Sequence, residues 1–212
     1  MPASGDSLAF GSPSVRICFD LESDAIMPGG FHFADPDVHR AAYRRQHAGG
    51  GIEFRCGVLF DEARGEFEEF GPDQLAAFVG RLAQADALIS QNGIAHDLTL
   101  LETVLPSDAT TLLRRKPHAD LMHIDRARLP ELAARHIPDR LPLLNDQADA
   151  RRQRADELWP PVQLFRGYEQ RPAENHLEHF LAKCRLDVEC TYLIFRKIEA
   201  EQPDRIRWIR DA

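Results

Sequence analysis

The sequence predicts an α/β protein with a mixed β-sheet flanked by helices, and three features of its order support this class. Segments with the alternation typical of strands, at 15–23, 52–60 and 65–70, come before any strong helical pattern. After residue 71, short apolar strands alternate with amphipathic helices, and the last element is a long helical stripe. This order is typical of a sheet that has both antiparallel and parallel neighbours.

The first three strands come from the amino-terminal third of the chain. VRICFDLES at 15–23 has the period of two that places successive side chains on opposite faces of a sheet. PGG at 28–30 ends this strand, and we expect a loop up to residue 51 with at most one helical turn near 37–46. IEFRCGVLF at 52–60 and GEFEEF at 65–70 are joined by DEARG, which indicates a hairpin.

The middle of the chain alternates between helix and strand. GPDQLAAFVGRLAQAD at 71–86 has apolar residues at helical spacing, and Asp73 is its expected N-cap. ALISQN at 87–92 is a short buried strand that leads directly into a helix at 93–105. HADLMHI at 118–124 follows as another short strand.

The carboxyl-terminal third is less regular until its last element. ARLPELAARH at 127–136 predicts a short helix, and residues 139–175 read as loops, with a helix at 146–157 as the alternative. The segment 173–202 has apolar residues at helical spacing throughout, which predicts one long helix.

Length and composition indicate one globular domain. The 212 residues fit a single domain over 14–212, which follows a disordered leader at 1–13. Neither a signal peptide nor an apolar stretch of membrane length is visible, so we expect a cytoplasmic protein. No CxxC pair occurs, which indicates buried free thiols in a reducing compartment: Cys18, Cys56, Cys184 and Cys190.

The charge of the chain excludes one class of nucleic-acid-binding protein. A formal net charge of −8 argues against coating DNA through a basic surface, because such binding needs an excess of Lys and Arg. It is compatible with an enzyme whose acidic site is neutralised by divalent cations. Two basic runs, LRRK at 113–116 and RRQR at 151–154, fit a solvated helix face or loop better than a phosphate contact.

Acidic residues in three distant segments are candidates for one metal site. Asp20 and Glu22 share a face of the first strand, because residues i and i+2 point the same way. Asp97 lies near the start of a helix, shortly after Asn92. Asp187 lies beside the apolar stripe of the last helix, where a carboxylate needs a cation or hydrogen bonds. Taken singly, each also fits an ordinary acid at a strand or helix end.

Taken together, these segments resemble the DEDD 3′-to-5′ exonuclease superfamily, which has the ribonuclease H-like fold and includes proofreading exonucleases. FDLES resembles its first motif, LISQNGIAHDLTLL its second and KCRLDVECTYLIF its third, in the same order. HADLMHI resembles a strand found in exonucleases related to the DNA polymerase B proofreading domain. The resemblance covers residues 15–200, and the joint spacing of the motifs is its specific part.

The resemblance implies an enzyme that hydrolyses phosphodiester bonds at the 3′ end of single-stranded DNA or RNA. Asp20, Glu22, Asp97 and Asp187 match the acidic positions that hold two divalent cations, Mg²⁺ or Mn²⁺, and Asn92 is expected to contact substrate. Oxygen ligands suit these hard cations. Two such ions can activate a water and stabilise the leaving 3′ oxygen.

Lys183 departs from the superfamily pattern, which has a Tyr four residues before the last Asp or a His five residues before it. This chain has Lys183 and Ala182 at these two positions. Positions i and i+4 share a helix face, so Lys183 can reach the site of Asp187. We expect it to orient or deprotonate the attacking water, or to bind the scissile phosphate. The alternatives are a plain ion pair with Asp187, or a catalytically weakened or inactive module that binds nucleic acid or a partner. Four other residues are weaker candidates for the site: His96, His176, His179 and Tyr192.

Two matters stay open from the sequence. No motif distinguishes DNA from RNA, because that choice depends on contacts to the 2′-hydroxyl. The segment 28–51 could form a wall of the substrate groove, and its aromatic residues could stack on bases or anchor the loop. These aromatic residues are Phe31, Phe33 and Tyr43.

Overall fold

The computed structural model describes residues 15–25, 36–122 and 177–210. At its centre is a five-stranded sheet in the order β3-β2-β1-β4-β5. The first strand pairs antiparallel with the second and parallel with the fourth, which confirms the expected mixed sheet. The strands are β1 (Arg16–Ser23), β2 (Phe54–Asp61), β3 (Glu66–Phe70), β4 (Ala87–Ser90) and β5 (His118–Asp120).

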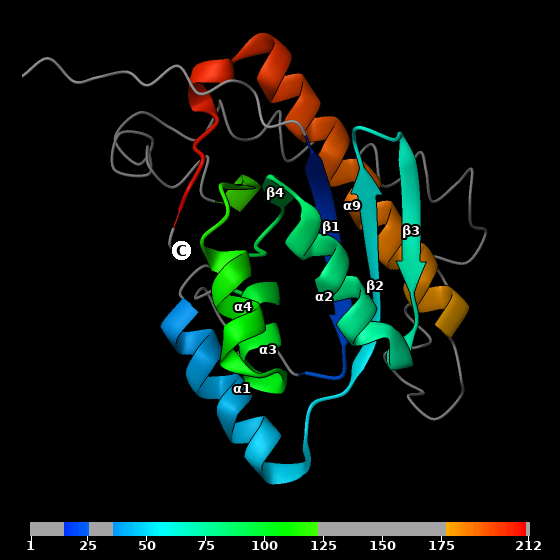
Figure 1. Ribbon diagram of the computed structural model, residues 1–212, viewed down its shortest axis with the longest axis vertical. Coiled ribbons are helices and arrows are strands. Elements are labelled where there is room, and N and C mark those ends of the chain that lie inside the picture. The colour runs from blue at the N-terminus through cyan, green and yellow to red at the C-terminus, as the bar shows by residue number, and fades with distance from the viewer. Residues whose placement is uncertain (1–14, 26–35, 123–176, 211–212) are drawn as a thin grey trace, which may run out of the picture.

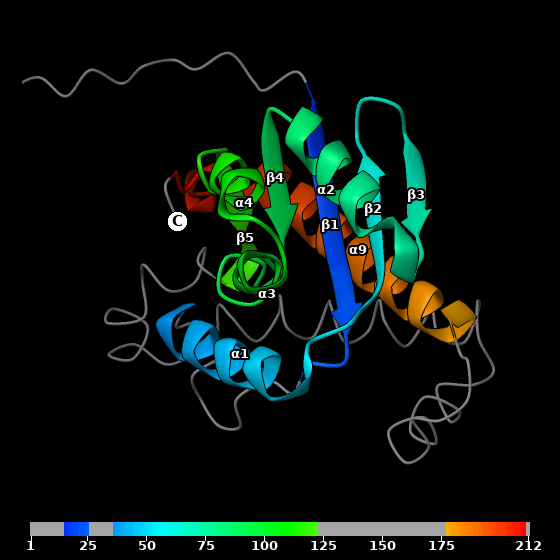
Figure 2. The same cartoon turned by 60° about the horizontal axis from the view of Figure 1, so that its bottom comes forward.

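Helices cover both faces of this sheet, as Figures 1 and 2 show. Helix α2 lies over β1 and β2 on one face, and the long helix α9 crosses the opposite face. Helix α3 packs between α1 and α4 beside the sheet. The helices are α1 (Pro36–Gly50), α2 (Leu75–Gln84), α3 (Asp97–Val104), α4 (Ser107–Arg114) and α9 (Leu177–Glu201), with short 3₁₀ turns η1 (Pro72–Gln74) and η3 (Pro203–Arg205).

The alternation of β1 divides its side chains between two cores. Ile17, Phe19 and Leu21 point into the core beneath α2. Cys18 points the other way, into the core beneath α9. The expected period of two therefore holds in β1, and it sends the odd and even residues of one strand into different layers. The thiols of three cysteines, Cys18, Cys56 and Cys184, are free and buried as expected, whereas the side chain of Cys190 lies outside the described part.

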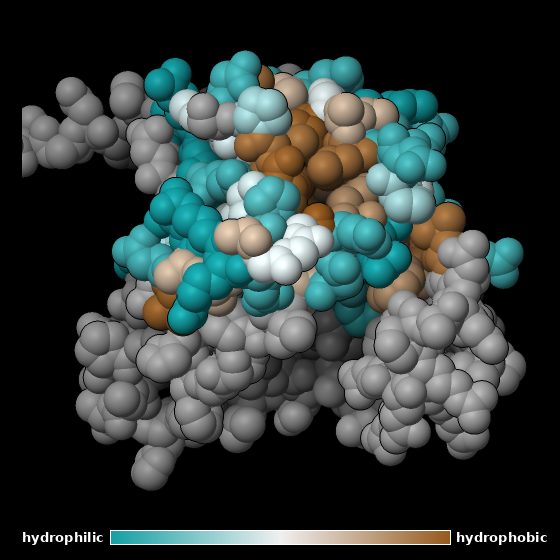
Figure 3. Space-filling view, turned by 90° about the horizontal axis from the view of Figure 1, so that it is seen from below, coloured by the Kyte–Doolittle hydropathy of each residue, from teal (hydrophilic) through white to brown (hydrophobic). Residues whose placement is uncertain are grey.

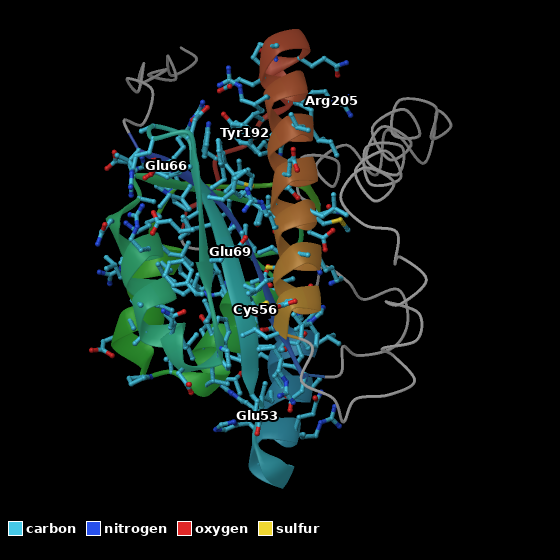
Figure 4. All side chains as sticks on the ribbon, turned by 90° about the vertical axis from the view of Figure 1, so that its right-hand side faces the viewer. Glu53, Cys56, Glu66, Glu69, Tyr192 and Arg205 are labelled. Atoms are coloured by element: carbon cyan, nitrogen blue, oxygen red, sulfur yellow. The ribbon has the colours of Figure 1, made fainter. Side chains whose placement is uncertain are left out.

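A cluster of charged residues holds α9 against the sheet. The guanidinium of Arg16 on β1 contacts both Glu62, which follows β2, and Glu199 on α9. Tyr192 donates a hydrogen bond of 3.0 Å to Glu62 Oε1, and Figure 4 shows Tyr192 on the side of α9 that faces the sheet. Arg196 also binds Glu62, at 2.7 Å. Because α9 carries Lys183 and Asp187, this cluster helps to fix the position of the candidate site.

We expect Glu62→Gln to lower the free energy of unfolding by about 1–3 kcal/mol at pH 7, since charged hydrogen bonds are lost. Burial raises the pKa of Glu62, but hydrogen bonds from Arg16 and Tyr192 and the charge of Arg196 outweigh burial and lower it overall. The stabilisation is therefore complete above the unfolded-state pKa of about 4.3 and is lost as the pH falls through the lower folded-state pKa.

Urea unfolding of wild type and Glu62→Gln at pH 7 and at several values below pH 4 measures this dependence. The difference between the two proteins should shrink as the pH is lowered. The exposed Glu66, replaced in the same way, is the control. A difference that stays constant over this range would contradict the ionic origin of the effect.

Two helices were not expected. Residues 36–50 form α1, where the sequence suggested a loop with one helical turn. Its buried residues occupy one narrow stripe, His39, Ala42 and Tyr43, and the other faces carry mostly polar, charged or small residues. The apolar period was too weak to reveal it. Tyr43 is completely buried, so it is an anchor of the segment and not a base-stacking residue.

Helix α4 was missed because its buried positions are few. The structure buries Thr110 and Leu113 from its eight residues, and Pro106 precedes its first turn. The expected N-cap Asp73 was wrong: residues 72–74 form a 3₁₀ turn, and Gln74 stands at the N-cap of α2 without a side-chain cap. The Gln74 side chain instead accepts a hydrogen bond from the backbone N–H of Gly71 at 2.8 Å.

Several expectations fall on parts of the chain outside the described residues. They concern the leader at 1–13, the turn at 28–30, the helix at 127–136, the segment 139–175 with its basic run at 151–154, and the aromatic residues Phe31 and Phe33. Among the described helices, none is both long and apolar enough to cross a bilayer. The end of the molecule where α1 lies has a mainly hydrophilic surface around a smaller hydrophobic area (Figure 3).

Candidate active site

The candidate site lies where the carboxyl end of β1 passes beneath α9. Asp20 and Glu22 are half-buried and point from β1 toward this helix, whereas Leu21 between them points into the opposite core. The strand β2 pairs with β1 along the stretch that carries both residues, and β4 pairs with the start of β1 at Arg16–Cys18. The two carboxylates therefore sit on a rigid element.

Helix α9 adds a third carboxylate, Asp187. Carboxylate oxygens of Asp20, Glu22 and Asp187 all lie within 4.8 Å of one another. Burial and the charges of Asp187 and Glu22 raise the pKa of Asp20 well above its usual value, although Lys183 and a hydrogen bond with Cys184 act against this. Carboxylates at this separation repel one another, so a cation among them would stabilise all three.

Lys183 supplies one positive charge to this cluster. Its ammonium contacts Glu22 Oε1, and Nζ lies 3.6 Å from Asp187 Oδ2. Burial lowers the pKa of Lys183, but the charges of Glu22, Asp187 and Asp20 outweigh burial and hold the pKa above the usual value of a lysine. In this arrangement Lys183 is a cationic donor and not a proton acceptor.

Asp97 lies next to the cluster but outside the group of three. It is the first residue of α3 and only 1% exposed. Its Oδ1 atom has no hydrogen-bond partner among the described residues. Burial and the charges of Asp20, Asp120 and Glu22 raise the pKa of Asp97 well above its usual value. Such a carboxylate is unfavourable in the metal-free protein unless a proton, a cation or a ligand offsets its charge.

The turn before α3 is shaped by Asp120, at the end of β5. The Asp120 carboxylate accepts hydrogen bonds from the backbone N–H groups of Asn92 at 2.7 Å, Ile94 at 2.9 Å and Met122 at 2.9 Å. These bonds hold Asn92 in the left-handed region, at a φ of 66°. They also explain why α3 begins at Asp97, four residues later than the sequence suggested, and why β5 ends at Asp120.

Gly93 is required by close packing in this turn. A Cβ atom at Gly93 would lie 2.3 Å from Ser90 Oγ and 3.3 Å from Asp97 Oδ2. Ser90 Oγ accepts a hydrogen bond of 3.1 Å from the backbone N–H of Gly93 and lies 2.7 Å from His118 Nε2. A larger residue at position 93 would therefore displace Ser90 and press on Asp97.

Arg114, from the basic run 113–116, braces the same turn from α4. It contacts Glu102 and donates hydrogen bonds to Thr99 Oγ1 at 3.1 Å and to the carbonyl oxygen of Ile94 at 3.4 Å. These partners agree with a structural role for this residue and not with a phosphate contact.

A cavity of about 430 Å³ opens beside the acidic cluster. This volume is in the usual range for small-molecule sites. Asn92 lines the cavity, and its buried Oδ1 atom has no hydrogen-bond partner among the described residues. His96, Met122 and Thr191 contribute to the same wall. The cavity therefore combines carboxylates, one ammonium group and the side chain of Asn92.

The residues of the site fit a divalent cation of the Mg²⁺ or Mn²⁺ type. Asp20, Glu22 and Asp187 offer oxygen atoms at one place, and Cys or His is absent from this group among the described residues. The unpartnered oxygen of Asp97 is a second, independent sign that a ligand belongs beside them. Carboxylate oxygens are the ligands that these cations prefer.

Sequence reasoning missed one residue of this site, Asp120, and underrated another, His96. Asp120 looked like an ordinary strand residue, and only its place at the end of a strand parallel to β4 could have pointed to it. His96 was given little weight, yet it lies on the cavity wall. Tyr192 lies away from the cavity in contact with Glu62, while His176 and the side chain of His179 are outside the described residues.

Comparisons with known proteins give a likeness of fold. No protein-family profile matches the sequence, and no curated protein matches it either. Among solved structures, the chain is similar to the family B DNA polymerase from the hyperthermophilic archaeon Pyrobaculum calidifontis, with a TM-score of 0.50 and 14% sequence identity. The similarity covers 87% of this chain but only 24% of the polymerase. This distant structural similarity agrees with an α/β fold of the ribonuclease H-like type.

Proposed function

We propose that this protein is a metal-dependent 3′-to-5′ exonuclease that hydrolyses phosphodiester bonds at the 3′ end of DNA or RNA. The observation that carries this proposal is the convergence of Asp20, Glu22 and Asp187 within 4.8 Å, next to the buried Asp97 with its unpartnered oxygen. The order of the three motifs and the distant structural similarity to a DNA polymerase support the same proposed activity.

In this proposal, Asp20, Glu22, Asp97 and Asp187 hold two divalent cations, Mg²⁺ or Mn²⁺. The bound ions supply an activated water and offset the charge that develops on the scissile phosphate. The protein contributes a fixed arrangement of ligands, because three of the carboxylates come from β1 and α9, which pack closely together. Asp97 comes from α3, whose first turn is fixed by the bonds to Asp120.

Lys183 and Asn92 take the role of substrate-binding residues. Lys183 keeps its positive charge, so it can donate to a phosphate oxygen and stabilise negative charge in the transition state. The contact of its ammonium with Glu22 favours this role over that of a general base. Asn92 lines the cavity, so its side-chain amide is placed to contact the nucleotide.

A 5′-labelled single-stranded oligonucleotide, offered as DNA and as RNA with Mn²⁺ or Mg²⁺, tests the activity. The expected result is a ladder of products shortened from the 3′ end, which stops growing when EDTA is added. Asp20→Ala should remove the ladder because it deletes a central ligand of the cluster. Asp73→Ala, an exposed acid on η1, is the matched control and should leave the rate unchanged.

One observation favours a second function. Lys183 contacts Glu22 and lies close to Asp187, so it already neutralises part of the cluster. A module that binds nucleic acid or a partner without cleaving it could use the same arrangement. Binding of the oligonucleotide without shortening, for both DNA and RNA and with either cation, would favour that module and reject the exonuclease.

A further inference from the structure

A second set of polar side chains lies behind the cavity wall, between α1 and α3. His39 and Tyr43 project from α1, and His96 stands at the N-cap of α3. Their three rings are 5.6–5.8 Å apart between centroids. His39 and Tyr43 are 1% and 0% exposed, whereas the side chain of His96 is 20% exposed and reaches the cavity.

Hydrogen bonds connect these rings in one line. The Tyr43 hydroxyl lies 3.1 Å from His39 Nδ1 and contacts His96 Nδ1 on its other side. Since a phenol has one proton, it donates to one of these nitrogen atoms and accepts from the other. The direction of this line therefore determines which nitrogen of His96 carries hydrogen.

The surroundings of His96 decide the direction of this line. Its Nε2 atom lies 4.0 Å from Asp97 Oδ1, and the side chain of His96 lines the cavity. An N–H group on this side is attracted by the adjacent Asp97 Oδ1, and a lone pair would be repelled by it. Tyr43 therefore donates to Nδ1 of His96 and accepts from His39, which leaves an Nε2–H donor at the cavity wall.

We propose that His96 is a substrate-binding residue, whose Nε2–H donates to an acceptor oxygen of the nucleotide in the cavity, and that Tyr43 and His39 position it. This proposal rests on the proposed nucleic-acid function but adds a contact and a role for α1. The acceptor is either a phosphate oxygen or the sugar 3′-hydroxyl. Neither Tyr43 nor His39 contacts the nucleotide; both act through the His96 ring.

Substitution of His96 by Asn or by Gln distinguishes the contributions of the two ring nitrogens of histidine. The amide of Gln can reach the position of Nε2 and keep a donor there, while the shorter Asn can only replace Nδ1. Tyr43→Phe removes the hydroxyl that fixes the tautomer but keeps the buried ring. His47→Asn, at an exposed position near the end of α1, is the matched control.

Calorimetric binding of thymidine 5′-monophosphate in the presence of Mn²⁺ is the first measurement. We expect His96→Asn to weaken nucleotide binding by about fivefold or more, Tyr43→Phe by about threefold, and His96→Gln by less than about twofold. Binding of Mn²⁺ alone should stay within about twofold in all three variants. The 3′-deoxy analogue identifies the acceptor: if the 3′-hydroxyl accepts, wild type and His96→Asn bind the analogue equally.

Equal nucleotide affinity in wild type and His96→Asn would overturn the proposal, as would a loss in His96→Gln equal to that in His96→Asn. A large loss of Mn²⁺ affinity in His96→Asn would also overturn it, because His96 would then be a metal ligand. The proposed exonuclease activity can fail without the role of His96 failing. If the wild type binds the nucleotide but shortens no oligonucleotide, the nucleotide affinities of the variants still test His96. In an active enzyme, His96→Asn should raise KM more than it lowers kcat.

Discussion

Replacing Asp97 by Asn is expected to stabilise the metal-free protein and to abolish shortening of the 3′ end. Asp97 is buried beside like charges and has an oxygen without a partner in the described structure. Removing its charge relieves this repulsion but deletes a proposed cation ligand. The loss of several kcal/mol of transition-state stabilisation corresponds to about a thousandfold or more in rate.

The pH dependence of this stabilisation has a definite sign. The pKa of Asp97 is raised in the folded protein, so ionisation of the carboxyl destabilises the fold. That penalty is absent below the unfolded-state pKa of about 3.9 and grows as the pH rises toward the higher folded-state pKa. Asp97→Asn should therefore exceed wild type in stability at pH 7, and the difference should disappear near pH 3.

Thermal unfolding with and without Mn²⁺ provides the measurement. Wild type should gain stability when Mn²⁺ is added, because a ligand that binds the folded state stabilises it. Asp97→Asn should gain much less, although it starts from a higher midpoint. Asp73→Asn is the surface control. An Asp97→Asn protein that is destabilised without metal, or that gains as much from Mn²⁺ as wild type, would contradict the assigned role.

Lys183→Ala is expected to change metal binding and turnover in opposite directions. Lys183 is the cation that contacts Glu22 and lies 3.6 Å from Asp187, so its removal leaves the acidic cluster more negative. Affinity for Mn²⁺ should rise by about tenfold, and the metal-free protein should lose stability. Turnover should fall by about tenfold or more, because a donor to the phosphate is lost.

Two further variants at this position separate charge from shape. Lys183→Arg keeps the positive charge and should bind Mn²⁺ much as wild type does. Lys183→Tyr introduces the residue found here in the exonuclease superfamily that the motifs resemble, and it should keep more turnover than Lys183→Ala. Calorimetric titration with Mn²⁺ and single-turnover cleavage measure the two effects. An unchanged cleavage rate in Lys183→Ala would eliminate its role in the reaction.

The central elements could be predicted because each has a strong local signal. The alternation in β1, the hairpin of β2 and β3, and the apolar stripe of α9 all depend on burial by neighbouring layers, and burial fixes the hydrophobic period. Helix α1 was not predicted because it buries only a narrow stripe that includes two polar rings, His39 and Tyr43. The burial of this stripe depends on contact with α3, which no local sequence pattern reveals.

Part of the candidate site could likewise be predicted from local sequence patterns, and part could not. Asp20 and Glu22 could be placed on one face from their spacing alone, and Lys183 could be placed beside Asp187 from the helical repeat. The contact of Lys183 with Glu22 joins β1 to α9 and could not be derived from either segment. The role of Asp120 likewise depends on the parallel pairing of β4 with β5, which brings its carboxylate to the turn at residues 92–94.

By itself, the sequence determined the mixed α/β fold, from the order of its elements, and the faces on which the acidic residues lie, from side-chain periodicity within single segments. Lys183 stood out only through the resemblance of the motifs to the exonuclease superfamily. Only the tertiary structure decided which charges meet. It left Asp97 buried with an unpartnered oxygen, kept Lys183 charged and turned His96 toward the cavity. The physical reason is that electrostatic interactions and desolvation depend on distances between segments far apart in the chain.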